Sequence, residues 1–314
     1  MEFRNLGRSG LQVSVVGLGC NNFGMRMDLE NTKSVVSAAL DAGINLFDTA
    51  DVYGGSKSEE FLGIALEGKR DDAVVATKFG MKMGEGPYKG GASRKYIIAE
   101  CEASLRRLNT DYIDLYQIHT PDPKTPIEET MRALDDLVKA GKVRYTGHSN
   151  FSGWQAAEAH YIAEMHGLTH FISAQNEYSL LQRGIEAELV GACETFGVGV
   201  LPYFPLASGL LTGKYKQGEE PPVGTRFGEW FKGPFAARTL NDRNFGIVGQ
   251  LEEFSAARGH TILDLAFGWL ITKGYVGSVI AGATKTEQVA SNVAAGKAWR
   301  LTVEEMADVN KITR

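Results

Sequence analysis

Short apolar runs recur along the chain at intervals of roughly 30 residues, and a segment with helical periodicity follows each run. This alternation is typical of βα units, whose parallel strands are buried on both faces and therefore read as continuous apolar stretches. The runs predict eight strands, at residues 13–19, 44–48, 73–78, 113–119, 143–149, 172–178, 198–204 and 276–282.

The segments between the runs carry signals for the start and stop of helices. In TPIEETMRALDDLVKAGK, Thr125 is the expected N-cap and Glu128 its capping-box partner. Pro126 suits the first helical position, and Gly141 suits the C-terminal stop. The expected apolar face of this helix comprises Met131, Leu134, Leu137 and Val138.

Other helices carry signals of the same kind. Ser56 and Glu59 form an expected capping box, and Thr286 is the expected N-cap of the helix after the last strand. Cys101 lies on an apolar helical stripe, so core packing is expected of it and not a reactive thiol. The same stripe contains Ile97, Leu105 and Leu108.

Eight βα units in 314 residues predict one (β/α)8 TIM-barrel domain over residues 1–314, because an open doubly wound sheet fits this count less well. No linker rich in Pro, Gly and Ser divides the chain. Residues 209–240 interrupt the alternation of apolar runs and helical segments with a polar stretch rich in Gly and Pro. Such long irregular segments are usually functional or mobile. We expect this stretch to be a long loop over the mouth of the barrel.

Composition and charge narrow the partners. With 43% hydrophobic and 23% charged residues and a net charge of −5, the chain has no general electrostatic attraction for nucleic acid or an anionic membrane. Its three cysteines fit neither a disulfide framework nor a zinc cluster, and no stretch reads as a signal peptide or membrane span. We expect a cytoplasmic protein without a metal site, and nothing in the sequence indicates an oligomeric state.

The stretch GLGCNNFG follows a predicted strand and invites comparison with nucleotide-binding loops. Gly17, Gly19 and Gly24 lack the G-x-G-x-x-G spacing, and no helix signal follows at once. Tight backbone packing and close approach to a ligand at the barrel mouth both remain open.

Polar residues gather where the predicted strands end. In a barrel these ends converge on one face, where the active sites of such enzymes lie. Each residue alone has a structural explanation, such as a helix cap, a snorkelling lysine or a turn histidine. Together they predict chemistry, and they are Asp48, Lys78, His119, Ser149, Asn150, Gln175, Asn176 and Tyr203, with Tyr53 in the loop after Asp48.

The motifs that carry these residues resemble those of the aldo-keto reductases, in order and over almost the whole chain. They are DTADVYG, ATKFG, IDLYQIHTPDP, GKVRYTGHSNF, SAQNEYSLLQR, PLASGLLTGKY and GATKTEQVASN. The chain is most similar to the bacterial reductases and the potassium-channel β-subunit-like branch. The resemblance implies a (β/α)8 barrel that binds a nicotinamide cofactor without a Rossmann domain.

By this resemblance Asp48, Tyr53, Lys78 and His119 match the family's catalytic tetrad. Tyr53 would be the general acid, and the Lys78 ammonium would favour its phenolate by lowering its pKa. Asp48 would keep Lys78 charged and aimed, and His119 would orient the carbonyl oxygen. Asp51 is expected to be loop structure and not the second carboxylate of a catalytic pair.

The resemblance also implies NADP(H) as cofactor. Ser149, Asn150 and Gln175 match the positions that bind the nicotinamide carboxamide, and Tyr203 matches the aromatic ring on which the nicotinamide stacks. Phe204 stands where the family commonly has a serine. The other implied contacts on this side are Gly19, Cys20, Asp48, Pro205, Leu206, Ser208, Gly209 and Leu211.

Phosphate partners are implied on the adenosine side. Lys214 and Arg226 would be cationic partners, although a solvated loop charge explains Arg226 equally well. Lys285 or Arg226 would attract the 2′-phosphate that separates NADP from NAD, while Ser291 departs from the acidic residue often found there. The implied adenosine contacts, at a helix N-terminus, are Gly282, Thr284, Lys285, Gln288 and Asn292.

These implications predict NADPH-dependent reduction of an aldehyde or ketone, with a small-molecule carbonyl as substrate. The alternative is a regulatory or redox-sensing protein that keeps its cofactor bound and turns over slowly. Several residues near the mouth suggest an apolar or aromatic pocket, although exposure at the surface or packing within loops explains them equally well. These residues are Phe23, Met25, Met83, Tyr88, Trp230 and Phe231.

Overall fold

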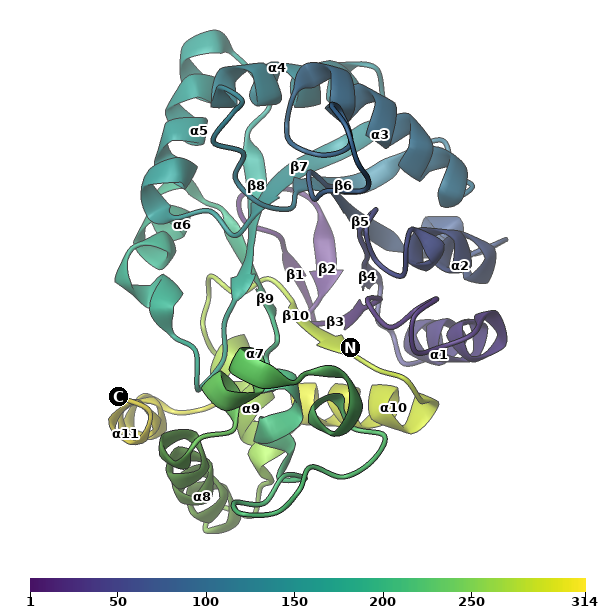
Figure 1. Ribbon diagram of the computed structural model, residues 1–314. Helices are drawn as coiled ribbons and strands as arrows, with labels where there is room; N and C mark the ends of the chain where they lie inside the picture. The colour runs from purple at the N-terminus through teal and green to yellow at the C-terminus, as the bar shows by residue number, and fades with distance from the viewer.

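The computed structural model describes residues 1–314, and its centre is a ring of eight parallel strands in the order β10-β3-β4-β5-β6-β7-β8-β9 (Figure 1). Two hydrogen bonds close the ring between β9 and the residues just before β10, from the Val200 N–H to the Tyr275 carbonyl (2.8 Å) and from the Gly277 N–H to the Val200 carbonyl (2.9 Å). The predicted (β/α)8 barrel is therefore confirmed. The strands are β3 (Val16–Gly19), β4 (Leu46–Asp48), β5 (Val74–Phe79), β6 (Ile113–Ile118), β7 (Val143–Ser149), β8 (Phe171–Glu177), β9 (Gly199–Tyr203) and β10 (Val279–Gly282).

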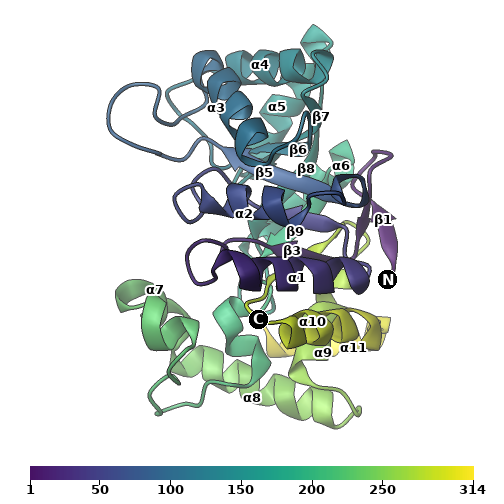
Figure 2. The same cartoon turned by 90° about the vertical axis from the view of Figure 1, so that its right-hand side faces the viewer.

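A hairpin that the apolar pattern did not reveal precedes the barrel. The run at residues 13–19 divides into the end of β2 (Gln12–Ser14) and β3, and β2 pairs antiparallel with β1 (Phe3–Asn5). Leu6 and Val13 of this hairpin region pack with barrel-interior residues such as Leu115. Figure 2 shows the hairpin at one end of the barrel and α7 (Gly233–Thr239) at the other, so the hairpin plugs the end opposite the mouth.

Helices surround the ring on the outside (Figure 1). The largest apolar cluster lies between them and the strands, and it includes Ile97, Cys101, Leu105 and Leu108, as predicted for that stripe. The helices of the repeating units are α1 (Leu29–Asp41), α2 (Lys57–Ala65), α3 (Arg94–Arg107), α4 (Ile127–Lys139), α5 (Gly153–His166), α6 (Leu189–Phe196), α9 (Ile262–Ile271) and α10 (Thr286–Ala298). The additional elements are α8 (Asp242–Ala256), α11 (Val303–Ile312) and the short turns η1 (Arg70–Asp72) and η2 (Gly184–Ala187).

The predicted caps of α4 and α10 are wrong. Pro126, not Thr125, is the N-cap of α4, and the Thr125 hydroxyl donates to Asp122 Oδ2 at 2.8 Å instead. Thr286 is the first residue of α10, and its N-cap is Lys285, which makes no side-chain cap bond. Gly141 does follow the end of α4, with a left-handed φ of 74°.

The predicted capping box of α2 is also wrong. Ser56 holds the N-cap position with a φ of 75°, and its side chain makes no cap bond. Glu59 is fully buried and accepts hydrogen bonds from Thr77 Oγ1 (2.6 Å) and Arg107 Nε (2.6 Å). Its carboxylate therefore ties α2 to β5 and α3 instead of capping its own helix.

The stretch predicted as a long loop contains short helical segments. Besides α7 it includes most of η3 (Ala207–Thr212) and all of η4 (Arg226–Trp230), a single π-helical turn. The Phe227 ring is buried and lies 5.3 Å from Tyr215 and 6.3 Å from Phe235, which anchors the segment. No helix anywhere in the structure combines the length and the apolar character that crossing a bilayer requires.

Candidate active site

A buried ion pair lies at the carboxyl ends of β4 and β5. The Lys78 ammonium donates to Asp48 Oδ1 at 2.8 Å and to the Thr49 carbonyl at 2.8 Å. The Lys78 side chain is 0% exposed and that of Asp48 is 5% exposed, so neither charge is solvated by bulk water. Gln175, near the end of β8, donates its Nε2 to the same Asp48 oxygen at 2.8 Å. These contacts link β4 to β5 and, across the mouth, to β8.

Tyr53 stands above this pair, in the loop after β4. Lys78 Nζ lies 5.1 Å from the centroid of its ring, and the His119 ring meets it edge-on at 5.7 Å. Burial raises the pKa of the Tyr53 hydroxyl, and the opposing positive charge of Lys78 lowers it by less, so the net direction is upward. The expectation that Lys78 brings this pKa below its ordinary value is therefore wrong for this structure, because desolvation outweighs the charge.

His119 follows β6 and faces the same space. Its side chain is buried, and burial followed by the charge of Lys78 lowers the pKa of His119 to about 3. The imidazole is therefore neutral at physiological pH, with one ring nitrogen as donor and the other as acceptor. Its Nδ1 has no hydrogen-bond partner in the protein.

Three polar side chains near the ends of β7 and β9 form a connected network. Asn150 Nδ2 donates to the His119 carbonyl at 2.9 Å and to Ser149 Oγ at 3.1 Å, and Asn150 Oδ1 accepts from the Tyr203 hydroxyl at 2.8 Å. Ser149 Oγ in turn donates to the Gln175 carbonyl at 2.7 Å. Asn150 has a left-handed φ of 61°, so several bonds hold it in a conformation that few residues adopt. The network fixes one wall of the site.

These groups open into a cavity of about 550 Å³. The residues proposed from the sequence that line it are Gly19, Asp48, Tyr53, His119, Ser149, Asn150, Gln175, Tyr203, Phe204, Pro205, Leu206, Ser208, Gly209, Lys214, Arg226, Gly282, Thr284, Gln288 and Asn292. Residues of the barrel mouth and of the start of α10 thus share one concave surface. It is large enough for an elongated small molecule.

Five of the residues proposed for chemistry or cofactor binding do not line the cavity: Lys78, Cys20, Asn176, Leu211 and Lys285. Asn176 is buried, and its Nδ2 donates to the Phe151 carbonyl at 3.2 Å. Lys78 lies behind it, in contact with Asp48. Cys20 and Leu211 are fully buried, and Lys285 is exposed outside the lining. Cys20, Leu211 and Lys285 therefore lie outside the lining of this cavity, and their assignment as cofactor contacts stays a prediction.

The segment after β9 forms a rim with unusual backbone geometry. Phe204, Ala207 and Ser208 all have left-handed φ values, of 50°, 45° and 57°. Gly209 has a φ of 100°, and a Cβ at this position would lie 2.6 Å from Lys214 Nζ. A larger residue at this position would strain the backbone and push the end of the Lys214 side chain aside.

Three cationic side chains line one end of the cavity: Arg26, Lys214 and Arg226. Burial, and then the charge of neighbouring Arg26, lowers the pKa of Arg226 to about 10. Burial and the charges of Arg226 and Arg26 lower the pKa of Lys214. The three positive charges repel one another, and no carboxylate is among the groups that shift the pKa values of Lys214 and Arg226. This cluster therefore indicates a site for an anion with more than one charge.

Sequence reasoning missed part of the lining and misplaced the aromatic residues. The additional lining residues include Asn21, Asn22, Arg26, Thr212, Gly224, Thr225 and Ser291. The GLGCNNFG stretch was the available signal for the first two, since close approach to a ligand was one of its two explanations. None of Phe23, Met25, Met83, Tyr88, Trp230 and Phe231 lines the cavity, and Phe23 is fully buried in the core.

Comparison with known proteins agrees with this architecture. The sequence matches the family model described as "Aldo/keto reductase family" over residues 15–314. A protein of Oryza sativa subsp. japonica named "Probable voltage-gated potassium channel subunit beta" is 38% identical over 314 residues, which cover 98% of this chain and 95% of that protein. "L-glyceraldehyde 3-phosphate reductase" of Escherichia coli (strain K12) is 34% identical over 320 residues, which cover 99% of this chain and 92% of that protein.

Proposed function

Because the chain belongs to the aldo/keto reductase family, we propose that it is an oxidoreductase that reduces an aldehyde or ketone to the alcohol with NADPH. The observation that carries the proposal is the buried Asp48–Lys78 pair beneath Tyr53 and His119, at the wall of the cavity. A structural ion pair alone would not need a phenol and a neutral imidazole beside it.

The lining of the cavity fits NADP(H). The Arg26, Lys214 and Arg226 cluster supplies the positive charge that a cofactor with several phosphates needs. Elsewhere in the lining, the Ser149, Asn150 and Gln175 polar groups suit a carboxamide, and Tyr203 offers an aromatic surface for a flat ring. We therefore assign the cationic end to phosphates and the Tyr53 end to the reacting carbon.

The residues of the chain perform the proton half of the reaction. The reduced nicotinamide, when bound, supplies a hydride to the carbonyl carbon. His119 donates a hydrogen bond to the carbonyl oxygen and orients it, and Tyr53 donates its proton to that oxygen as charge develops there. The raised pKa of Tyr53 keeps this proton in place at neutral pH. The Lys78 ammonium then stabilises the tyrosinate that remains, and Asp48 holds Lys78 in position.

The experiment that tests the proposal is a panel of carbonyl compounds, including a phosphorylated aldehyde, followed by NADPH absorbance. Separate titrations of NADPH and NADH, followed by protein fluorescence, test the cofactor assignment, and NADPH should bind more tightly than NADH. Turnover of no panel member by protein that binds NADPH would contradict the assignment as a reductase. Equal or reversed affinities for the two cofactors would contradict the preference for the 2′-phosphate of NADPH and leave the reductase assignment intact.

The names of two relatives favour a second function. The rice protein above and "Putative voltage-gated potassium channel subunit beta" of Schizosaccharomyces pombe (strain 972 / ATCC 24843), 36% identical over 327 residues, are named as channel subunits. That alignment covers 99% of this chain and 93% of that protein. A regulatory protein that keeps its cofactor would oxidise bound NADPH slowly. Single-turnover mixing with a reactive aldehyde separates it from an enzyme.

A further inference from the structure

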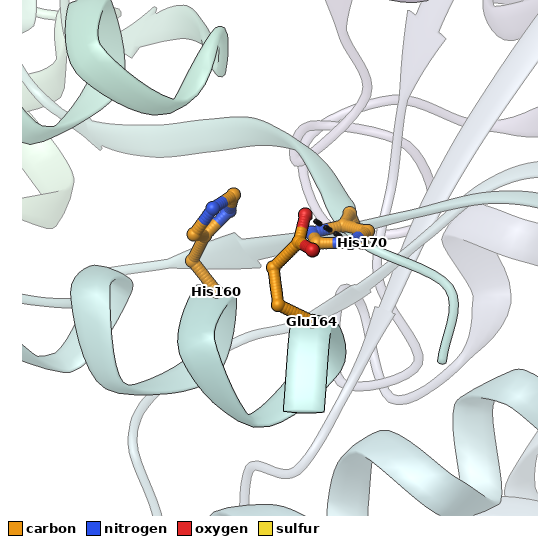
Figure 3. Close-up of side chains that lie close together, drawn as sticks. All are labelled: His160, Glu164 and His170. Carbon is orange, nitrogen blue, oxygen red and sulfur yellow. Dashed lines mark ion pairs between the residues drawn. The ribbon is translucent and has the colours of Figure 1, made fainter. Parts of the chain in front are cut away.

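Two histidines and a glutamate meet on the outside of the barrel, away from the mouth. His160 and Glu164 are one helical turn apart on α5, and His170 precedes the first residue of β8 (Figure 3). One potential ligand atom from each of the three lies within 4.8 Å of the other two. Figure 3 shows Glu164 between the two imidazoles, with an ion pair at 3.4 Å from its Oε1 to His170 Nε2.

The backbone fixes this arrangement. Gly167 ends α5 with a left-handed φ of 61°, and the Leu168 N–H donates to the Ala163 carbonyl at 2.9 Å. The chain therefore reverses within a few residues. The His170 carbonyl accepts a hydrogen bond from Thr146 Oγ1 at 3.0 Å, which holds the segment against β7. His170 is thus returned to the side of α5 that carries the other two residues.

The three side chains differ in how firmly the surrounding protein holds them in place. The His160 ring stacks on Phe196 with centroids 4.2 Å apart and lies 4.9 Å from the His170 ring. Glu164 is 63% exposed and free to change rotamer.

We propose that His160, Glu164 and His170 form a binding site for a Zn²⁺-class divalent ion, with water as the fourth ligand. Two imidazoles and one carboxylate are a ligand set that zinc takes in proteins. Zinc bonds of about 2.0–2.2 Å place tetrahedral ligands about 3.4 Å apart, so a pair of ligand atoms that lie within 4.8 Å of each other must approach by no more than about 1.4 Å. The exposed Glu164 and the half-buried His170 supply that movement.

The bound ion would staple α5 to the start of β8. His170 lies five residues before Gln175 of the same strand, or about 16 Å of extended chain from the proposed active site. The ion is therefore expected to raise thermal stability without entering the reaction. All three cysteines are buried and do not compete for the metal.

The test is zinc titration of the full-length, tag-free protein against a chromophoric chelator. His170→Ala and Glu164→Gln remove ligands, and His166→Ala is the matched control, since it changes a histidine at the end of the same helix that pairs with Glu128 instead. We expect one Zn²⁺ per chain in the unsubstituted protein and in His166→Ala. Affinity should fall by more than about tenfold in His170→Ala and Glu164→Gln.

Two further readouts identify the ligands. Co²⁺ should give visible absorption bands of a tetrahedral ion in the unsubstituted protein, and His170→Ala should lose them. Zn²⁺ should raise the melting temperature of the unsubstituted protein and of His166→Ala but not of His170→Ala. Absence of zinc binding in the unsubstituted protein, or equal binding in His170→Ala, would overturn the proposal. Zinc that binds equally in all variants and inhibits carbonyl reduction would assign the ion to His119 and likewise refute it.

Discussion

Replacement of Tyr53 by Phe is the sharpest test of the proposed chemistry. The change removes one hydroxyl and keeps the ring, so the contacts with Lys78 at 5.1 Å and His119 at 5.7 Å are retained. Lys78 keeps both of its 2.8 Å bonds, to Asp48 Oδ1 and the Thr49 carbonyl. The free energy of unfolding should therefore change by no more than about 1 kcal/mol.

The effect on the reaction should be far larger than the effect on stability. Loss of a positioned general acid costs about 10²–10⁴-fold in rate, which corresponds to about 3–5 kcal/mol of transition-state stabilisation. The hydroxyl is not among the groups assigned to the cofactor, so the dissociation constant for NADPH should change by less than about threefold. Reduction should fail while cofactor binding persists.

The assay is kcat for carbonyl reduction by NADPH absorbance, with NADPH affinity measured by protein fluorescence. Tyr116→Phe is the matched control, because Tyr116 is also buried and its hydroxyl has no partner, but it lies on β6 outside the proposed site. The control should retain its activity. A rate for Tyr53→Phe within about tenfold of the unsubstituted protein would refute the assignment of Tyr53 as the acid.

Three other predictions concern charge. In fluorescence titrations, Arg226→Ala should weaken NADPH binding by about tenfold or more and NADH binding little, because only NADPH carries the 2′-phosphate; equal loss for both would contradict the assignment of Arg226 to that phosphate. Burial lowers the pKa of His148 to about 3. The unfolded state therefore takes up a proton near pH 6.5 that the folded state refuses, and stability falls by about 1.4 kcal/mol per pH unit below that pH. Urea unfolding at pH 6.5 and at pH 5 measures this effect. Between these two pH values His148→Phe should lose less free energy of unfolding than the unsubstituted protein, and equal losses would show that His148 is not the origin of the pH dependence. Burial, followed by the charges of Glu100 and Glu59, raises the pKa of Asp51 to about 8. The folded state then holds a proton that the unfolded state releases near pH 4, so this group's contribution to stability falls as pH rises from 4 to 8. Asp51→Asn should therefore gain stability over the unsubstituted protein as pH rises through this range, and an advantage independent of pH would show that Asp51 does not hold the proton.

The barrel and much of the site could be predicted from the sequence because both depend on patterns that repeat. Apolar runs between helical segments require a parallel sheet, and a parallel sheet brings the ends of β4, β5 and β8 together. Asp48, Lys78 and Gln175 meet for that reason, as the structure confirms. The hairpin β1–β2 escaped prediction because its strands have 3 residues each, too few for a period to be legible.

Side-chain choices between competing partners could not be predicted. Glu59 sits at capping-box spacing from Ser56, yet Arg107 and Thr77, distant in sequence, offer it stronger buried bonds. Thr125 similarly finds Asp122 before its own helix. The direction of the Tyr53 pKa was missed because a sequence names the neighbouring charge but not how deeply the hydroxyl is buried.

The hydrogen bonds from Lys78 and Gln175 to Asp48 join three strands at the mouth, and they have an evolutionary consequence. Asp48 receives hydrogen bonds from β5 and from β8, so its loss would leave Lys78 as an uncompensated buried charge, at a cost of about 3–5 kcal/mol. A descendant retained only for its shape would still be selected to keep that pair. Tyr53 carries no such burden, since phenylalanine preserves its packing. In a lineage that no longer depends on catalysis, position 53 would therefore be the first of these positions to accept a substitution.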